Sequence, residues 1–159
     1  MNGSWIQSLD LILRLIFAMT AGAIIGLNRW LSHKPAGLGT HALVALGAAL
    51  ASVVVLRAPG ADANAVSRVI QGLVTGVGFI GAGVIMRENS GQQIHGLTTA
   101  ASIWISAIIG IACGISDFVV GVAGLVLALV VLVISKPLEE AAGRIFKHQH
   151  DEPIKGSRN

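Results

Sequence analysis

The sequence predicts an all-α integral membrane protein, a bundle of about five transmembrane helices with a glycine-rich central third helix. Of its 159 residues 53% are hydrophobic and 12% are charged, whereas soluble domains carry about 25% charged residues. Several uncharged runs approach the roughly 20 residues that cross a bilayer as a helix. Glycine recurs in two of them, Gly76–Ile85 and Gly96–Trp104, and small residues let helices in lipid pack closely.

The predicted transmembrane domain covers residues 1–135. Its five spans are expected at residues 9–27, 40–56, 69–86, 97–115 and 118–135, separated by polar breaks and by a tight turn at Ser116 and Asp117. The first span is expected to be retained, because Met1–Gln7 lacks the cation of a signal peptide. Residues 136–159 are predicted to form a short amphipathic helix at the cytoplasmic surface and then a disordered tail.

The distribution of cations predicts the orientation, since loops rich in Lys and Arg stay in the cytoplasm. The loops after the first and third spans and the tail hold Arg29, Lys34, Arg87, Lys136, Arg144, Lys147, Lys155 and Arg158. The C-terminus is therefore expected in the cytoplasm and the N-terminus outside. This bias also explains the net charge of +3, so no nucleic-acid partner is predicted from the charge. The predicted partner is the lipid bilayer.

Glycines on the predicted spans are interpreted as helix-packing positions. They are Gly22, Gly26, Gly72, Gly76, Gly78, Gly81, Gly83, Gly110 and Gly114. Those of the third span fall on two opposite sides of a helix, which predicts close neighbours on both sides. The pairs in the first and fourth spans suit packing within one chain or between chains, and we expect a homo-oligomer. The third span also fits G-x-G-x-x-G, but without a βαβ context no cofactor is predicted.

Polar residues inside the spans are candidates for function. Asp10 and Arg14 are spaced to form an ion pair on one helical face, near the outer interface. Gln71 suits a hydrogen bond to a neighbouring helix or the coordination of an ion. Magnesium prefers carboxylates with retained waters, and the spans supply only Asp10. We therefore predict no metal site within one chain, and no catalytic constellation that would make it an enzyme.

Four segments resemble the MgtC/SapB family of bacterial inner-membrane proteins. They are residues 22–29 (GAIIGLNR), 34–47 (KPAGLGTHALVALG), 71–85 (QGLVTGVGFIGAGVI) and 96–114 (GLTTAASIWISAIIGIACG). The resemblance implies about five spans and a link to magnesium homeostasis and growth in low magnesium. The chain resembles a short form of the family, which is expected to lack the soluble C-terminal domain of larger relatives.

The family motif falls here on Arg29, Thr40, His41, Gln71, Thr98, Thr99 and Trp104. The chain departs from it at Asn28, where the family commonly has Glu, and at Gly39, where it commonly has Arg. Some relatives are thought to act through other membrane proteins, so the resemblance implies a non-enzymatic protein that works by such contacts. The alternative is a transporter of magnesium or another cation, with a pathway between subunits that collects Asp10, Gln71 and the hydroxyls of the fourth span.

Overall fold

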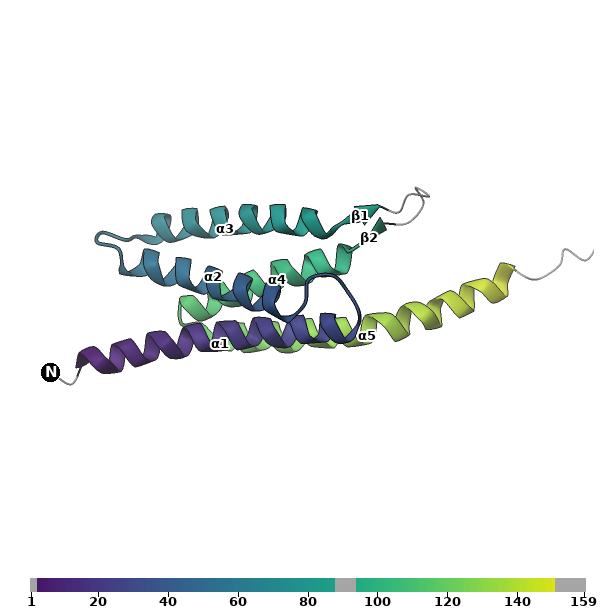
Figure 1. The fold of residues 1–159 in the computed structure, drawn as a ribbon, viewed down its shortest axis with the longest axis horizontal. Helices are drawn as coiled ribbons and strands as arrows, with labels where there is room; N and C mark the ends of the chain where they lie inside the picture. Colours follow the sequence, from purple (N-terminus) through teal and green to yellow (C-terminus); the bar gives the residue numbers. More distant parts are fainter. Residues whose placement is uncertain (1–2, 88–93, 151–159) are drawn as a thin grey trace, which may run out of the picture.

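The computed structural model describes residues 3–87 and 94–150, which form five helices and a short hairpin (Figure 1). The helices are α1 (Gly3–Leu31), α2 (Leu38–Arg57), α3 (Ala63–Val84), α4 (Leu97–Gly114) and α5 (Phe118–His150). Strands β1 (Met86–Arg87) and β2 (Ile94–His95) pair antiparallel between α3 and α4. All five helices contain a segment long and apolar enough to cross a membrane. The predicted class, an all-α membrane bundle, is confirmed.

Side-chain caps and glycine begin the helices where the sequence has polar breaks. The Asp62 carboxylate accepts a hydrogen bond from the Ala65 amide at 2.7 Å and caps α3, and Asp117 accepts one from the Val120 amide at 3.1 Å at the start of α5. Gly96 precedes α4 with φ +95°, and a Cβ there would lie 3.0 Å from the carbonyl carbon of Val84. Only glycine meets both constraints without strain.

Helix α4 occupies the middle of the bundle. It packs against α1, α2, α3 and α5, and 61% of its span is buried, against 11% of the α3 span. In Figure 1, α1 and α5 run along one side, α2 and α4 lie between, and α3 forms the opposite edge. The prediction of a central third helix was therefore wrong for the single chain, because the central helix is the fourth.

The glycines explain this arrangement. A Cβ at Gly26 would lie 2.6 Å from the Cα of Leu38, and one at Gly114 would lie 2.7 Å from the carbonyl oxygen of Ala49. Gly22 and Gly110 lie equally close to the α2 backbone at His41 and Ala45. Small residues on α1 and α4 thus let both helices approach α2.

The glycines of α3 behave differently from the prediction. Within the described residues, a Cβ at Gly72, Gly76, Gly78 or Gly83 would have no heavy atom within 4 Å, and one at Gly81 would meet only Ala100, at 3.5 Å. Helical periodicity showed two bare sides of this helix, but it carries no information about what covers them. The expectation of close neighbours on both sides is wrong within one chain.

Helix α5 is longer than its predicted span. It continues past Ser135 and through Pro137 to His150, and its C-terminal part extends beyond the bundle (Figure 1). The start of the predicted surface helix is therefore continuous with the fifth span. The predicted disordered tail falls on residues 151–159, outside the described part of the chain.

Candidate functional site

Four buried polar side chains meet at the end of the bundle where α1 ends and α2 and α4 begin. They are Arg29 on α1, His41 on α2, and Thr99 and Ser102 on α4, and we call them the polar cluster. Their exposed fractions are 3%, 0%, 0% and 4%, respectively. Buried polar side chains in a membrane protein are costly and mark functional sites by default.

Close helix packing positions the cluster. Gly26 lies against Gly37 and Leu38, which brings the last turn of α1 onto the first turn of α2. Arg29 follows Gly26 on α1, and His41 follows Leu38 on α2, so both side chains can reach α4 at its first turns. The cluster thus depends on small residues that lie outside it.

Arg29 links helices that are 70 residues apart in the sequence. Its Nη2 donates a hydrogen bond to Thr99 Oγ1 at 2.9 Å, while its buried Nε has no partner in the structure as described. The carboxylates whose side chains the structure describes, those of Asp10, Asp62 and Asp117, belong to the opposite end of the bundle. The guanidinium is therefore a buried positive charge without a described counter-ion, which is an unfavourable arrangement unless something else compensates it.

His41 makes a hydrogen bond with each ring nitrogen. Its Nδ1 lies 3.0 Å from the Gly37 carbonyl oxygen and its Nε2 lies 2.9 Å from Ser102 Oγ. A neutral ring satisfies both if Nδ1–H donates to the carbonyl and Nε2 accepts from the Ser102 hydroxyl. Ser102 Oγ also lies 2.8 Å from the Thr99 carbonyl oxygen, so two acceptors compete for one hydroxyl proton.

The other predicted residues lie outside the cluster. Thr40 is half-buried, and Trp104 is exposed on α4. Gln71 is exposed on α3, and its side-chain amide donates to Ser67 Oγ at 3.3 Å. Asp10 and Arg14 form the ion pair that their spacing suggested, in the N-terminal half of α1. In the described structure, none of these five residues joins the polar cluster.

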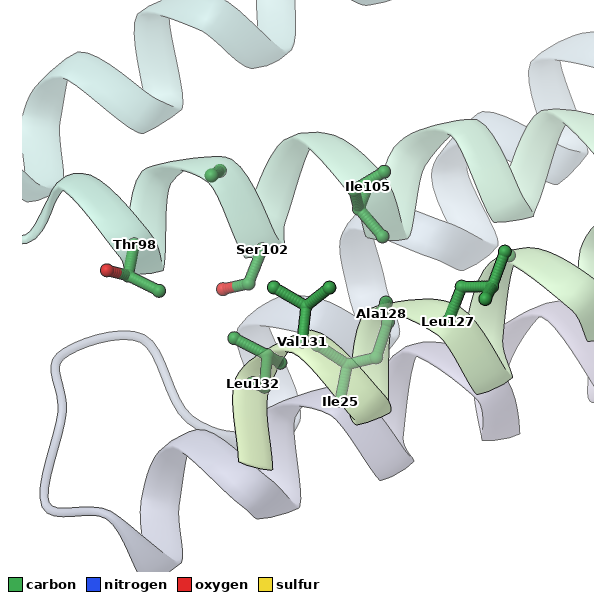
Figure 2. A pocket seen from close by; sticks show the side chains of 10 residues that line it. Ile25, Thr98, Ser102, Ile105, Leu127, Ala128, Val131 and Leu132 are labelled. Carbon is green, nitrogen blue, oxygen red and sulfur yellow. The ribbon is translucent and has the colours of Figure 1, made fainter. Parts of the chain in front are cut away.

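An apolar pocket adjoins the polar cluster. It has a volume of about 360 Å³ and lies between α4 and α5, with Ile25 of α1 at its floor (Figure 2). Ser102 belongs to both the cluster and the pocket wall, and the exposed Thr98 lies one turn before it. Ser102 is one of the fourth-span hydroxyls that the sequence offered for a pathway between subunits, and its spacing of three from Thr99 puts both on neighbouring turns of a buried helix.

The donors of the polar cluster determine what it can bind. A guanidinium and hydroxyls hydrogen-bond to anions and to carbonyl oxygens, whereas magnesium prefers carboxylate ligands. Among the side chains that the structure describes, no group of three His, Cys, Asp or Glu could hold a metal ion. The arrangement is that of a site for an acceptor or an anion.

The fold and the cluster define a multi-pass α-helical membrane protein with a buried cationic site at one end of its bundle. Residues 15–141 match the model of the MgtC family. Protein SrpB of Synechococcus elongatus is 43% identical over 151 residues, which cover 89% of this chain. Protein MgtC of Salmonella typhimurium is 43% identical over 84% of the chain, and the "Putative magnesium transporter YhiD" of Escherichia coli is 44% identical over 77%. The chain belongs to the MgtC family, as the resemblance indicated.

The chain matches different shares of these relatives. It spans 81% of SrpB, but 54% of the Salmonella MgtC and 59% of YhiD. The part of the chain that matches the family model, residues 15–141, contains the whole polar cluster. A comparison with solved structures gave no match.

Proposed function

We propose that this chain is a non-enzymatic membrane protein that serves magnesium homeostasis and adaptation to low magnesium, acting through contacts with other membrane proteins. Family membership supports the link to magnesium, since one relative is named a putative magnesium transporter. In our proposal it lies in the bacterial plasma membrane with its N-terminus outside and its C-terminus in the cytoplasm. The cations around the polar cluster, Arg29 and the exposed Lys34, favour this orientation.

The buried charge of Arg29 is the observation that carries the choice of contact over transport. At an effective dielectric constant of about 20, a magnesium ion held about 5 Å from this guanidinium is repelled by about 7 kcal/mol. No carboxylate among the described side chains lies at this end of the bundle to offset that repulsion. A path for a divalent cation past the polar cluster of one chain is therefore unfavourable.

A second copy of the chain is part of the proposal. The groove between α2 and α3 has a volume of about 740 Å³ and is lined by three glycines, Gly47, Gly72 and Gly76. Their bare backbone is open within the described chain, and close helix approach through small residues stabilises association in lipid. We propose that a helix of a second copy packs into this groove.

A cation transporter with a pathway between subunits is the second candidate. Gln71 supports it, because this polar side chain is exposed on α3, on the side of the helix away from the residues that line the groove. A pathway through Gln71 would need a further subunit contact on this other side of α3, away from the repulsive charge of Arg29.

Flux measurements separate the two candidates. Purified protein is reconstituted into liposomes that contain a magnesium-sensitive dye, with protein-free liposomes and the variants Gln71→Leu and Asp10→Ala alongside. Contact-based action predicts the same dye signal with and without protein. A protein-dependent influx that Gln71→Leu or Asp10→Ala abolishes would instead establish transport.

Crosslinking tests the contacts directly. Trp104 is 42% exposed on a helix that is otherwise mostly buried, so a photo-crosslinking amino acid at this position should capture a neighbouring membrane protein in cells starved of magnesium. Val119, 80% exposed at the other end of the bundle, is the matched control position. A discrete adduct from position 104 but not from position 119 supports the proposal, and the absence of adducts from position 104 contradicts it.

A further inference from the structure

We propose that the pocket between α4 and α5 binds an anionic amphiphile, with one acyl chain in the apolar pocket and the negatively charged head group next to Arg29. The inference depends on the polar cluster and the pocket, and not on the proposed role in magnesium homeostasis. Ligands of this class share an acyl chain that is joined to a negatively charged group, either a phosphate or a carboxylate.

The pocket has the dimensions and the lining for an apolar chain. Its volume of about 360 Å³ falls within the roughly 300–1,000 Å³ of small-molecule sites. Ile105 of α4 and Leu127, Ala128 and Val131 of α5 line most of its length (Figure 2). Leu127 and Val131 are also exposed on the outside of the bundle, so a chain can enter the pocket from the bilayer.

One end of the apolar pocket lies next to the polar cluster, because Ser102 belongs to both. Thr98 and Ser102 line this end from α4, and Leu132 of α5 lies below Ser102 (Figure 2). Arg29 follows Ile25 by one helical turn, about 6 Å along α1, and its Nη2 bonds to Thr99, the neighbour of Thr98. Arg29 does not line the pocket, so a head group comes near its guanidinium only at the end that Thr98 and Ser102 line.

Among the described side chains, Arg29 has no anionic partner, which is what a head group would supply. It is 97% buried, its Nε is unpaired, and the described carboxylates belong to the other end of the bundle. Lys34, whose amide bonds to the Arg29 carbonyl oxygen, adds a second, exposed cation at this corner. An anion held beside the exposed Thr98 would neutralise this charge at short range in a medium of low dielectric constant.

Lipid titration tests the proposal. Delipidated protein in detergent is titrated with phosphatidylglycerol, phosphatidylcholine and oleate, and the bound states are counted by native mass spectrometry. We expect at least one anionic ligand to bind about tenfold more tightly than phosphatidylcholine, because only it forms charge-assisted bonds. Preference for phosphatidylglycerol identifies a phosphate site, and preference for oleate a carboxylate site. Equal affinity for all three, or no binding, overturns the proposal.

Two kinds of variant assign that binding to this site. Arg29→Gln should remove the preference for the anionic ligand, and Arg29→Lys should retain most of it. Ala101→Phe, at an exposed position of the pocket wall, should fill the pocket and abolish binding, whereas Val126→Phe on the outer side of α5 should not. If Arg29→Gln does not fold, the Ala101→Phe and Val126→Phe variants still test whether the ligand binds in this pocket. Unchanged anionic binding in Ala101→Phe overturns the proposal.

Discussion

Replacing Gly110 by alanine tests whether α4 is the packed centre of the bundle. The added Cβ would lie 2.9 Å from the carbonyl carbon of Ala45 and 3.0 Å from its Cα, and closer still to its oxygen. Ordinary contacts of a Cβ are 3.4–4 Å, so the carbonyl carbon alone requires α2 and α4 to separate by about 0.5 Å, and the closer oxygen requires more. The atoms in the way belong to the backbone and cannot rotate aside.

The expected loss of stability follows from two opposing terms. Overpacking a tight interface costs about 1–3 kcal/mol, and occasionally more where backbone must move. Alanine recovers up to about 1 kcal/mol because it favours the helix over glycine. We expect Gly110→Ala to lower the free energy of unfolding by about 2 kcal/mol.

The control is Gly78→Ala on α3, where the new Cβ meets no heavy atom within 4 Å in the described chain and which does not line the groove between α2 and α3. This variant gains the helix propensity without the clash, so its stability should be unchanged or higher by up to about 1 kcal/mol. Both variants are unfolded in mixed micelles of rising sodium dodecyl sulfate content, and helix content is followed by circular dichroism. Equal stability of the two variants, or a greater loss for Gly78→Ala, would refute the assignment of α4 as the centre.

Three further substitutions follow from the same structure. Ser102→Ala leaves the buried Nε2 of His41 without its partner and should cost about 1–3 kcal/mol of stability in the same unfolding assay; no change would mean that the contact is not made. Gly76→Leu should leave the folded monomer intact but block the groove between α2 and α3, so that its mass by light scattering falls to that of one chain, and an unchanged oligomer would place the interface elsewhere. Asp10→Asn should change stability by less than about 1 kcal/mol, because the Asp10 side chain is 47% exposed, and a larger loss would show that the ion pair is part of the core.

Much of the fold could be predicted because lipid restricts the solutions. Backbone groups in hydrocarbon must bond within their own segment, so long uncharged runs become helices, and their number follows from their lengths. The end of the fifth helix could not be predicted in this way. A proline inside a helix normally kinks or ends it, yet α5 continues through Pro137 to His150.

The position of α3 could not be predicted from its glycines. Gly72 and Gly76 mark a bare helix face equally well whether a neighbour from the same chain, a second copy or lipid covers it. The glycines of α1 and α4 gave the same kind of signal, and those helices do lie against α2. Only the tertiary arrangement separates the two cases.

Part of the polar cluster could be predicted from the sequence. The motif pointed to Arg29, His41 and Thr99, but their meeting depends on how closely α1 approaches α2 at Gly26, which spacing along the chain does not determine. Gln71 and Trp104 belong to the same motif and lie elsewhere, on surfaces open to lipid or partners. A shared motif therefore combines a buried structural site with exposed positions.

The coupling between Arg29 and Thr99 is the most direct test of the central claim, that a buried guanidinium ties the end of α1 to the core helix α4. The measurement is a double-mutant cycle of Arg29→Met, Thr99→Val and the double variant, with free energies of unfolding in mixed micelles. Hydrogen bonds to charged groups contribute about 1.5–3 kcal/mol, so we expect a coupling energy of that size, with Thr99→Val more damaging alone than in the Arg29→Met background. Additive effects within about 0.5 kcal/mol would show that the two side chains do not interact, and would contradict the site as described.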